Sequence, residues 1–363
     1  MTPTSETELA EMIQGASGPL CIRGGATRGI DRPGDVLTTT GLSGITLYEP
    51  GALTMVAKAG TPVAEVVAAL DNEGQMLAFE PYDLAAITAA AGKSTIGGVF
   101  ATNASGPRRV AVGAARDFLL GVRLVDGGGT LVSNGGRVMK NVTGYDLVKL
   151  MAGSFGTLGV FSEVSFKVLP KPETTQTLVW HGLTDEQAGA LMRAAMGAPF
   201  DVTGAAHVAG SGELARTYIR VEGFEGSVRY RAEQLKALLA ARFGAAEIAE
   251  TTTHWTRLRD AAPIEGAGDI WRISVKPTDG PAAAKRLRAE AHMFDWSGGL
   301  IWARVPAETD VRAQLGGLAG HATLIRGEGQ ARFHPEAPGA AKIAAGLRAR
   351  FDPRGILNPG LMG

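Results

Sequence analysis

The sequence predicts an α+β fold with two domains, the second built on an antiparallel sheet. The 363 residues, 45% of them hydrophobic, are enough for more than one core. Short strands and short helices alternate as far as Pro170-Lys171-Pro172, which breaks the pattern, and longer strands and helices follow. We therefore expect a first domain at 1–172, a second at 173–337, and a helix and tail at 338–363.

The first domain opens with a short apolar strand that ends at Arg23 and runs into a glycine-rich loop. Residues 45–60 alternate as two strands around a turn at Pro50-Gly51. A helix follows, with Thr61 as its N-cap, Pro62 in its first turn and Gly74 at its end. The predicted apolar face of this helix, spaced i, i+3, i+4 and i+7, consists of Val63, Val66, Val67 and Leu70.

The rest of the first domain contains a second stretch of glycine and small residues at 94–106. Two alternating strands then flank the turn composition of residues 126–129, which predicts a β-hairpin. After the segments 140–150 and 153–161, a strand over 162–170 completes the domain.

The second domain alternates strands with amphipathic helices at about 184–196, 227–242 and 280–291. Thr184 and Ser227 are predicted N-caps, the former with Gln187 at the capping-box position. This order favours an antiparallel sheet with helices on one face. The tail helix, from Pro338, carries one apolar stripe of Ile343, Leu347 and Phe351.

Composition excludes several classes of function. Lys+Arg and Asp+Glu both number 36, so no broad basic field exists for a nucleic acid. Cys21 is the single cysteine, so the chain forms no internal disulfide and cannot ligate an ordinary iron–sulfur cluster. No basic leader and no long apolar stretch is seen, which favours a cytoplasmic protein.

Two glycine-rich loops are suited to a dinucleotide pyrophosphate. Small residues let several backbone N–H groups converge on one anion, and this composition occurs at Arg23–Gly29 and at Ser94–Gly98. Either loop alone could equally be an ordinary strand end. A nicotinamide fingerprint and a phosphate-binding loop with its lysine are both missing, so those two classes lose support.

Five motifs in order carry a resemblance to a known family: RGGATRG, STIGGVFATNASG, GAARD, KNVTGYDLVKLMAGSFGTLGVFSEVSFKVLPKP and FDPRGILNPG. Over about 20–172 and 346–363 the chain resembles the FAD-linked oxidases of the vanillyl-alcohol oxidase type. Within them it is most similar to the smaller FAD-binding subunit of bacterial glycolate oxidase.

The resemblance implies two α+β subdomains that clamp FAD, a cap domain over the flavin, and a tail that returns to the FAD domain. In the family the two glycine-rich loops hold the pyrophosphate, and the other motifs line the ribityl and flavin region. The implied cofactor-binding residues are Arg23, Gly24, Gly25, Ala26, Thr27, Arg28, Pro81, Ser94, Thr95, Ile96, Gly97, Gly98, Ala101, Asn103, Gly106, Gly113, Asp117, Gly144, Tyr145, Gly153, Gly156, Gly159 and Val160.

The implied activity is oxidation of glycolate, a small 2-hydroxy acid, to glyoxylate. The implied partners are a second FAD-binding subunit and an iron–sulfur subunit, with at most peripheral membrane association through that complex. Two alternatives stay open. The chain could be a stand-alone oxidase of another 2-hydroxy acid or alcohol, or an FAD-containing structural or relay subunit whose partner turns over the substrate.

Some positions depart from the family pattern. Ala26 stands where many relatives have a third glycine, and Thr27 stands where covalently flavinylated relatives have histidine. We therefore expect non-covalent FAD. The histidines are scattered, without the clustered spacing of metal-assisted relatives, so no metal site is expected. They are His181, His207, His254, His292, His321 and His334.

Catalytic candidates come from the segment LIRGEGQARFHP. Arg326 could hold a substrate carboxylate and His334 could act as a base, although a solvated loop or subunit interface explains the segment equally well. Asp146 could simply cap the helix that follows it, with Tyr145 in the core. A basic group consists of Arg108, Arg109 and Arg116, and it could form a solvated face or contact the cofactor.

Overall fold

The computed structural model describes residues 1–137, 144–249 and 251–362, so residues 140–143 of the fourth motif lie outside the described residues. Up to residue 170 the elements are α1 (Glu6–Gln14), β1 (Leu20–Arg23), β2 (Asp35–Thr38), β3 (Ile45–Glu49), β4 (Thr54–Lys58), α2 (Val63–Asp71), β5 (Gln75–Met76), α3 (Ala85–Thr88), α4 (Ile96–Ala101), α5 (Arg109–Val112), α6 (Ala115–Phe118), β6 (Leu119–Val125), β7 (Leu131–Gly135), α7 (Leu147–Met151), β8 (Val160–Lys167) and β9 (Leu169–Pro170).

The remaining elements are β10 (Thr174–His181), α8 (Asp185–Met196), β11 (Val202–Val208), β12 (Arg216–Gly223), α9 (Glu225–Phe243), β13 (Glu247–Ile248), α10 (Thr253–Arg259), β14 (Asp269–Val275), α11 (Gly280–Leu287), β15 (Ala291–Asp295), β16 (Leu300–Val305), α12 (Val311–Leu315), β17 (Gly320–Arg326) and α13 (Pro338–Phe351). None of these helices is long and apolar enough to cross a membrane.

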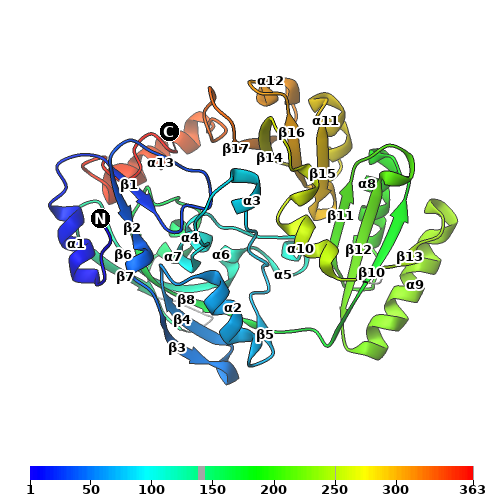
Figure 1. The fold of residues 1–363 in the computed structure, drawn as a ribbon, viewed down its shortest axis with the longest axis horizontal. Coiled ribbons are helices and arrows are strands. Elements are labelled where there is room, and N and C mark those ends of the chain that lie inside the picture. The colour runs from blue at the N-terminus through cyan, green and yellow to red at the C-terminus, as the bar shows by residue number, and fades with distance from the viewer. Residues whose placement is uncertain (138–143, 250, 363) are drawn as a thin grey trace.

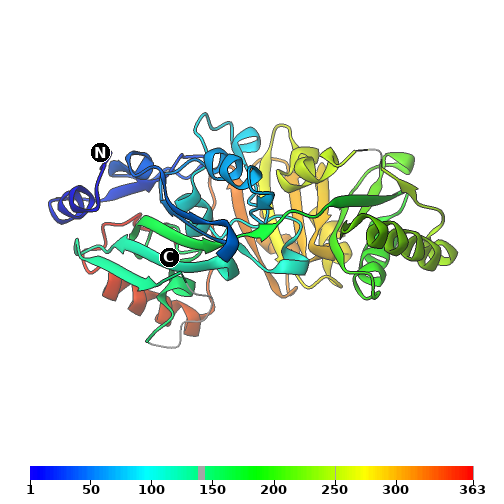
Figure 2. The same cartoon turned by 90° about the horizontal axis from the view of Figure 1, so that it is seen from below.

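Two large antiparallel sheets organise the chain, one in each half of the elongated molecule (Figures 1 and 2). The first has the order β3-β4-β8-β6-β7, and the second has the order β13-β10-β12-β11-β15-β16-β14-β17. The α+β fold class with an antiparallel second sheet is therefore confirmed. The limits at residues 172 and 337 stay predictions, and the separation of the sheets on either side of Pro170–Pro172 supports the first of them.

The second sheet has a different neighbour on each face. Helices α8, α9, α11 and α12 pack on one face, where Trp180, Trp271 and Phe294 are fully buried. The other face, with Tyr218 and Trp302, shares a core with the first half of the chain, and α10 lies in this layer. The predicted single layer of helices is therefore right for four helices and wrong for α10.

The tail lies next to the start of the chain. Leu357 pairs in parallel with Leu20, which extends the small β1-β2 sheet by one bridge, and α13 lies beside this region in Figure 1. No residue of α13 is buried, and Ile343 in its predicted stripe is 68% exposed. Leu347 and Phe351 of the stripe are half-buried and pack against the core, so only the Ile343 end of the stripe is left without contacts in this chain.

Three local predictions are wrong. Pro62 occupies the N-cap of α2, because the Thr61 hydroxyl already bonds to the backbone at Lys58 and Gly44. On the same helix Val67 is exposed. Ser227 lies inside α9, where its hydroxyl accepts a hydrogen bond from Arg231.

Candidate functional site

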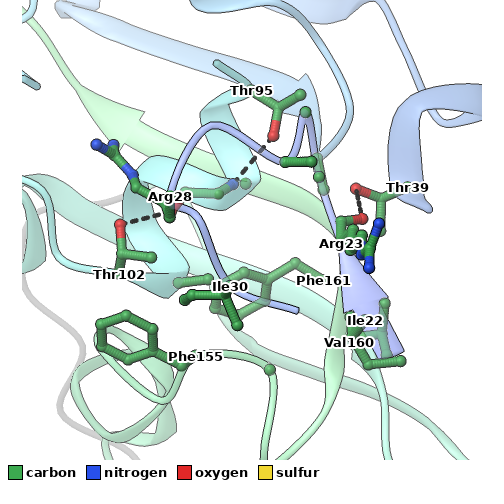
Figure 3. Close-up of a pocket in the computed structure, with 18 of the residues that line it drawn as sticks. Ile22, Arg23, Arg28, Ile30, Thr39, Thr95, Thr102, Phe155, Val160 and Phe161 are labelled. Carbon is green, nitrogen blue, oxygen red and sulfur yellow. Dashed lines mark hydrogen bonds between the residues drawn. The ribbon is translucent and has the colours of Figure 1, made fainter. Parts of the chain in front are cut away.

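A cleft lies between the two glycine-rich loops in the first half of the chain (Figure 3). The loop after β1 forms one wall, and residues 94–102 with α4 form the other. We call this the cofactor cleft, lined by Ile22, Arg23, Gly24, Gly25, Ala26, Thr27, Arg28, Ile30, Thr39, Ala59, Ser94, Thr95, Gly97, Gly98, Ala101, Thr102, Phe155, Gly156, Gly159, Val160, Phe161 and Asn358.

Glycine lets the two loops approach backbone to backbone. A Cβ at Gly25 would collide with the carbonyl of Lys93, and a Cβ at Gly92 would collide with the carbonyl of Gly25. A Cβ at Gly24 would likewise meet the hydroxyl of Thr95. The two loops therefore form one unit that any side chain at these positions would force apart.

The first loop carries backbone donors that the protein leaves unused. Within the described part of the chain, the N–H groups of residues 25–28 donate to no other residue. Ala26 has a φ of 56°, the left-handed conformation that lets neighbouring N–H groups point the same way. Converging free N–H groups with no carboxylate among the cleft residues fit a pyrophosphate.

The second loop is held in place by hydrogen bonds to the segment that joins β4 to α2. Ile96 N–H donates to the carbonyl of Thr61 at 2.9 Å, and Gly97 N–H donates to the carbonyl of Ala59 at 2.8 Å. The Thr95 hydroxyl caps α4 by accepting from Gly98 N–H at 3.3 Å (Figure 3). The amides of residues 96–98 are therefore used by the fold, whereas the N–H groups of Ser94 and Thr95 donate to no described residue.

Apolar side chains form a third wall of the cofactor cleft, beside the two glycine-rich loops. Ile30 and Phe155 face each other in Figure 3, and Val160 and Phe161 continue the wall from the start of β8. Asn358, from the last predicted motif, accepts from Ile22 N–H at 2.8 Å and donates to the carbonyl of Phe155 at 2.9 Å. The tail thus fixes both the first loop and the aromatic wall.

The cofactor predictions from the sequence divide into three groups. Most of them line the cofactor cleft. Asn103 and Gly153 line a second pocket, described next, whereas Pro81, Ile96, Gly106, Gly113, Asp117, Gly144 and Tyr145 line neither. Tyr145 is 87% exposed, which also contradicts the expected core position, and Asp146 caps α7 through Lys149 N–H.

The second pocket adjoins the cleft and shares Arg28, Ile30, Thr102 and Phe155 with it. We call it the inner pocket, because it lies where the second sheet meets the first half of the chain. Its lining is Arg28, Ile30, Tyr82, Leu84, Thr102, Asn103, Arg109, Gly153, Phe155, Arg272, Ser274, Trp296, His321, Thr323, Ile325, Arg332, Phe333 and Met362. This described lining contains four arginines and one histidine but no aspartate or glutamate.

Positive charge at the inner pocket changes the titration of its groups. Partial removal from water, together with the nearby charges of Arg272, His334 and Arg109, lowers the pKa of His321. Burial lowers the pKa of Arg28, whose Nη2 has no hydrogen-bond partner among the described residues. His321 is therefore neutral at pH 7.

The two catalytic candidates from the sequence lie elsewhere. The Arg326 guanidinium donates to the backbone carbonyls of Ile87, Gly266 and Gly268, so it ties β17 to neighbouring loops. His334 lines an outer groove beside α13 and does not line the inner pocket. The contacts of Arg326 give no support to its carboxylate role. His334 lies near His321, which lines both the groove and the inner pocket, so its role as a base stays a prediction.

The three arginines of the predicted basic group lie in three different environments. Arg108 is buried and bonds to Glu222 at 2.7 Å and 3.0 Å, Arg109 lines the inner pocket, and Arg116 is exposed.

Among described residues no cluster of three or more His, Cys, Asp or Glu side chains could hold a metal ion.

Sequence reasoning did not single out Arg272 and His321 as site residues, nor Trp296 as a site tryptophan. These residues come from β14, β17 and the short turn after β15, more than 150 residues beyond the second loop. Their places depend on strand pairing in the second sheet, such as Ser274 opposite His321. No local motif marks them; only the alternation within DIWRISV hints that Arg272 and Ser274 share a face.

Comparisons with known proteins agree with this geometry. Residues 1–135 match the family described as FAD binding domain. The glycolate oxidase subunit GlcE of Escherichia coli (strain K12) is 35% identical over 350 residues, covering 95% of this chain and 92% of that protein. The glycolate oxidase subunit GlcD of Bacillus subtilis (strain 168) is 32% identical over 179 residues, 49% of this chain and 36% of that protein.

The fold has a counterpart among solved structures. Alkyldihydroxyacetonephosphate synthase superposes with a TM-score of 0.71 over 99% of this chain and 76% of that one, at 16% sequence identity, which shows likeness of fold alone. Free loop amides, close glycine packing and an apolar wall fit FAD, and the sequence matches extend over nearly the whole chain. This chain therefore belongs to the FAD-linked oxidoreductases of the vanillyl-alcohol oxidase type.

Proposed function

We propose that this chain is the FAD-binding subunit of a glycolate oxidase complex that oxidises glycolate to glyoxylate. The similarity to a glycolate oxidase subunit over nearly the whole length supports this assignment. The observation that carries it is the inner pocket, where four arginines and a histidine meet with no acidic side chain in the described lining. Such a pocket favours a small organic anion beside the cofactor cleft.

FAD binding in this proposal is non-covalent. The N–H groups of residues 25–28 would hold the pyrophosphate, and Phe155 with Ile30 would cover the ribityl and ring portion. The described lining of the cofactor cleft has no histidine, cysteine or tyrosine, and Cys21 is buried within β1. The unused Nη2 of Arg28, at the junction of cleft and inner pocket, would donate to an oxygen of the ring.

His321 is the candidate base. FAD held in the cofactor cleft would supply the two-electron acceptor for the hydride of the glycolate C–H bond. The hydroxyl proton must leave at the same carbon, and a neutral imidazole can accept it. His321 lines the inner pocket with its pKa lowered, so its ring is available as a base at neutral pH.

Partners are part of the proposal because the electrons must leave the flavin. With Cys21 as its single cysteine, the chain has no thiolate set for a cluster. We propose that a second FAD-binding subunit and an iron–sulfur subunit take the electrons, in the cytoplasm or at most at the membrane periphery through the complex. The names of the two matched relatives, both subunits of glycolate oxidase, support such an assembly.

The first experiment is anaerobic addition of glycolate to the purified FAD-loaded chain, with the visible flavin spectrum as readout. Bleaching of the flavin in the chain alone is the result we expect. Bleaching that requires the two partner subunits would favour the relay alternative, because another subunit then oxidises the substrate. Bleaching by other alcohols or 2-hydroxy acids but not by glycolate would favour a stand-alone oxidase of different specificity.

A further inference from the structure

Two arginines from distant parts of the chain meet at one indole ring. The guanidinium carbon of Arg109, on α5, lies 4.4 Å from the ring centroid of Trp296, and that of Arg272, on β14, lies 4.9 Å from it. Each contact is a cation–π interaction that fixes the position of the charge. The inner pocket thus has a pair of oriented guanidinium groups on one wall.

Trp296 is itself held rigidly. Its Nε1–H donates to the carbonyl of Gly106 at 3.0 Å, and its backbone N–H donates to the Asp295 carboxylate at 2.7 Å. Both Trp296 and Ser297 have positive φ angles, 51° and 59°, which cost energy outside glycine. The surrounding structure maintains this strained turn, and the turn presents the indole between the two arginines.

Neither arginine is bonded to a carboxylate among the described residues, and Asp117 acts on Arg109 only through its charge at a distance. Among the described residues, the Arg109 and Arg272 side chains form no ion pair and donate no hydrogen bond, and Nε of Arg272 is buried without a partner. Burial, followed by the charge of Arg272, lowers the pKa of Arg109. By contrast, Arg326 and Arg332 use their guanidinium groups on backbone carbonyls. Two half-buried cations on one wall, without a bonded carboxylate between them, favour the binding of an anion.

The two strands behind the pair add polar groups on the same side. Arg272 and Ser274 are two residues apart on β14 and so face the same way, and they lie opposite Thr323 and His321 of β17. All four line the inner pocket. An anion on Arg272 therefore lies on the same wall as the imidazole of His321.

We propose that Arg109 and Arg272 form the site that binds the substrate carboxylate, which deepens the proposed function and rests on it. A planar carboxylate can accept from both guanidinium groups, neither of which is bonded to a carboxylate of the described residues. The carbon next to the carboxylate, which bears the hydroxyl group, then lies toward His321 and the cofactor cleft. The ligand class is a 2-hydroxymonocarboxylate.

The test is a titration of the FAD-loaded chain with oxalate, a carboxylate that cannot be oxidised by loss of hydride, followed by the change in the flavin spectrum. Arg272→Met and Arg109→Met are each expected to weaken oxalate binding by about 10- to 100-fold, the range for a charge-assisted hydrogen bond. Arg272→Lys keeps the charge and should recover part of this loss. Arg229→Met, on the exposed surface of α9, is the matched control and should bind like the parent.

Ligand-side controls need no variant. Glycolamide has the hydroxyl group of glycolate without its charge, so it should not perturb the flavin of the parent chain at concentrations where oxalate does. Unchanged oxalate affinity in Arg109→Met and Arg272→Met or, if these fail to fold, in Arg109→Gln and Arg272→Gln would overturn the site. Equal binding of glycolamide and oxalate would overturn the carboxylate class.

The outcomes separate this site from the proposed function. If oxalate binds through both arginines but glycolate never bleaches the flavin, the carboxylate site stands and glycolate oxidation by this chain fails. If glycolate bleaches the flavin with the same KM in all arginine variants, the function stands and this site fails. A KM raised at least about tenfold with a smaller change in kcat supports both.

Discussion

Single residues decide whether the cofactor loops can close. Gly25 and Gly92 allow contact between the two loop backbones that no side chain would permit, while Ala26 is exposed and adopts a positive φ of 56° despite its Cβ. The sequence departure at Ala26 therefore leaves the loop conformation intact. Its conformational cost is about 1 kcal/mol for a non-glycine residue in this region.

Gly25→Ala should weaken FAD binding by at least about tenfold, since overpacking of this kind costs about 1–3 kcal/mol or more. FAD affinity can be measured by quenching of flavin fluorescence during titration of the apoprotein. Gly18→Ala is the matched control, because a Cβ there has no atom within 4 Å. Equal affinities in the two variants would show that the loops do not close on FAD.

His321→Asn should lower kcat by about 10²- to 10⁴-fold if the imidazole accepts the hydroxyl proton. In the parent chain the activity should fall as pH drops through the pKa of His321, which lies below its ordinary 6.5, because the base must be neutral. The variant should lose this acidic limb. His181→Asn, an exposed residue bonded to Glu247, should keep the parent profile, and an unchanged limb in His321→Asn would reject His321 as the base.

How far the site could be predicted depends on how local its parts are. The first loop and most of the second were predicted because each is continuous in sequence and has a composition suited to an anion. Arg272 and Trp296 were not singled out for the site, because their positions arise from pairing of β14, β15 and β17. The polar segment around Arg326 has the composition of a substrate-binding loop, which is why the sequence suggests a carboxylate-binding role. In the fold, however, the Arg326 guanidinium donates to three backbone carbonyls.

Between elements, a buried ionic cluster joins the two halves of the molecule. Arg220 and Glu222 on β12 meet Glu80 and Arg108 from the first half, with Arg220 bonded to Glu80 at 2.9 Å and 3.0 Å. The Arg108 and Arg220 charges hold the pKa of Glu222 at about 2, against the effect of its burial. This cluster sets the position of the second sheet over the cofactor cleft.

Arg220→Met should destabilise the fold by about 3–5 kcal/mol, because Glu80 and Glu222 must then share the one remaining guanidinium group, that of Arg108, in a buried site. Urea unfolding at pH 7 measures the change. Lys171→Met breaks the exposed pair with Asp71 and serves as the control, with an expected loss under about 1 kcal/mol. A similar small loss in Arg220→Met would mean that water or rearrangement compensates the cluster.

Helices and strands could be predicted from the sequence where the residues at their ends carry a recognisable capping pattern. The capping box of Thr184 with Gln187 was predicted and is confirmed, because both partners lie within four residues. The N-cap of α9 is Phe224, whose side chain cannot cap a helix. The prediction of Ser227, the nearest serine, as the N-cap is therefore wrong. Strand β11 was not predicted, since its centre Gly204-Ala205-Ala206 lacks branched residues and is a strand only through its neighbours.

At the scale of the whole molecule, the buried carboxyl group of Asp295 makes the free energy of unfolding depend on pH. Asp295 is fully buried beside Trp296, and burial raises its pKa to about 7. The folded state therefore binds a proton between about pH 4 and pH 7 that the unfolded state releases. Stability falls as pH rises through this window.

Asp295→Asn keeps the oxygen that accepts from Trp296 N–H and removes the charge. The variant should therefore be more stable than the parent at pH 8, by about 2–4 kcal/mol at most, and similar to it near pH 4. Urea unfolding at the two pH values gives the difference. Asp201→Asn, which is exposed, should show no such pH-dependent gain, and a parent-like Asp295→Asn at pH 8 would contradict the raised pKa.

The contact of Asn358 with β1 also has a consequence for how the protein is made. Ile22 and Asn358 are 336 residues apart in the chain, yet their hydrogen bonds complete the wall of the cofactor cleft. A ribosome delivers Ile22 long before Asn358, and the intervening segments fold as they emerge. The mature cleft cannot exist on a nascent chain that still lacks residue 358, so we expect FAD capture to be a late event in biosynthesis.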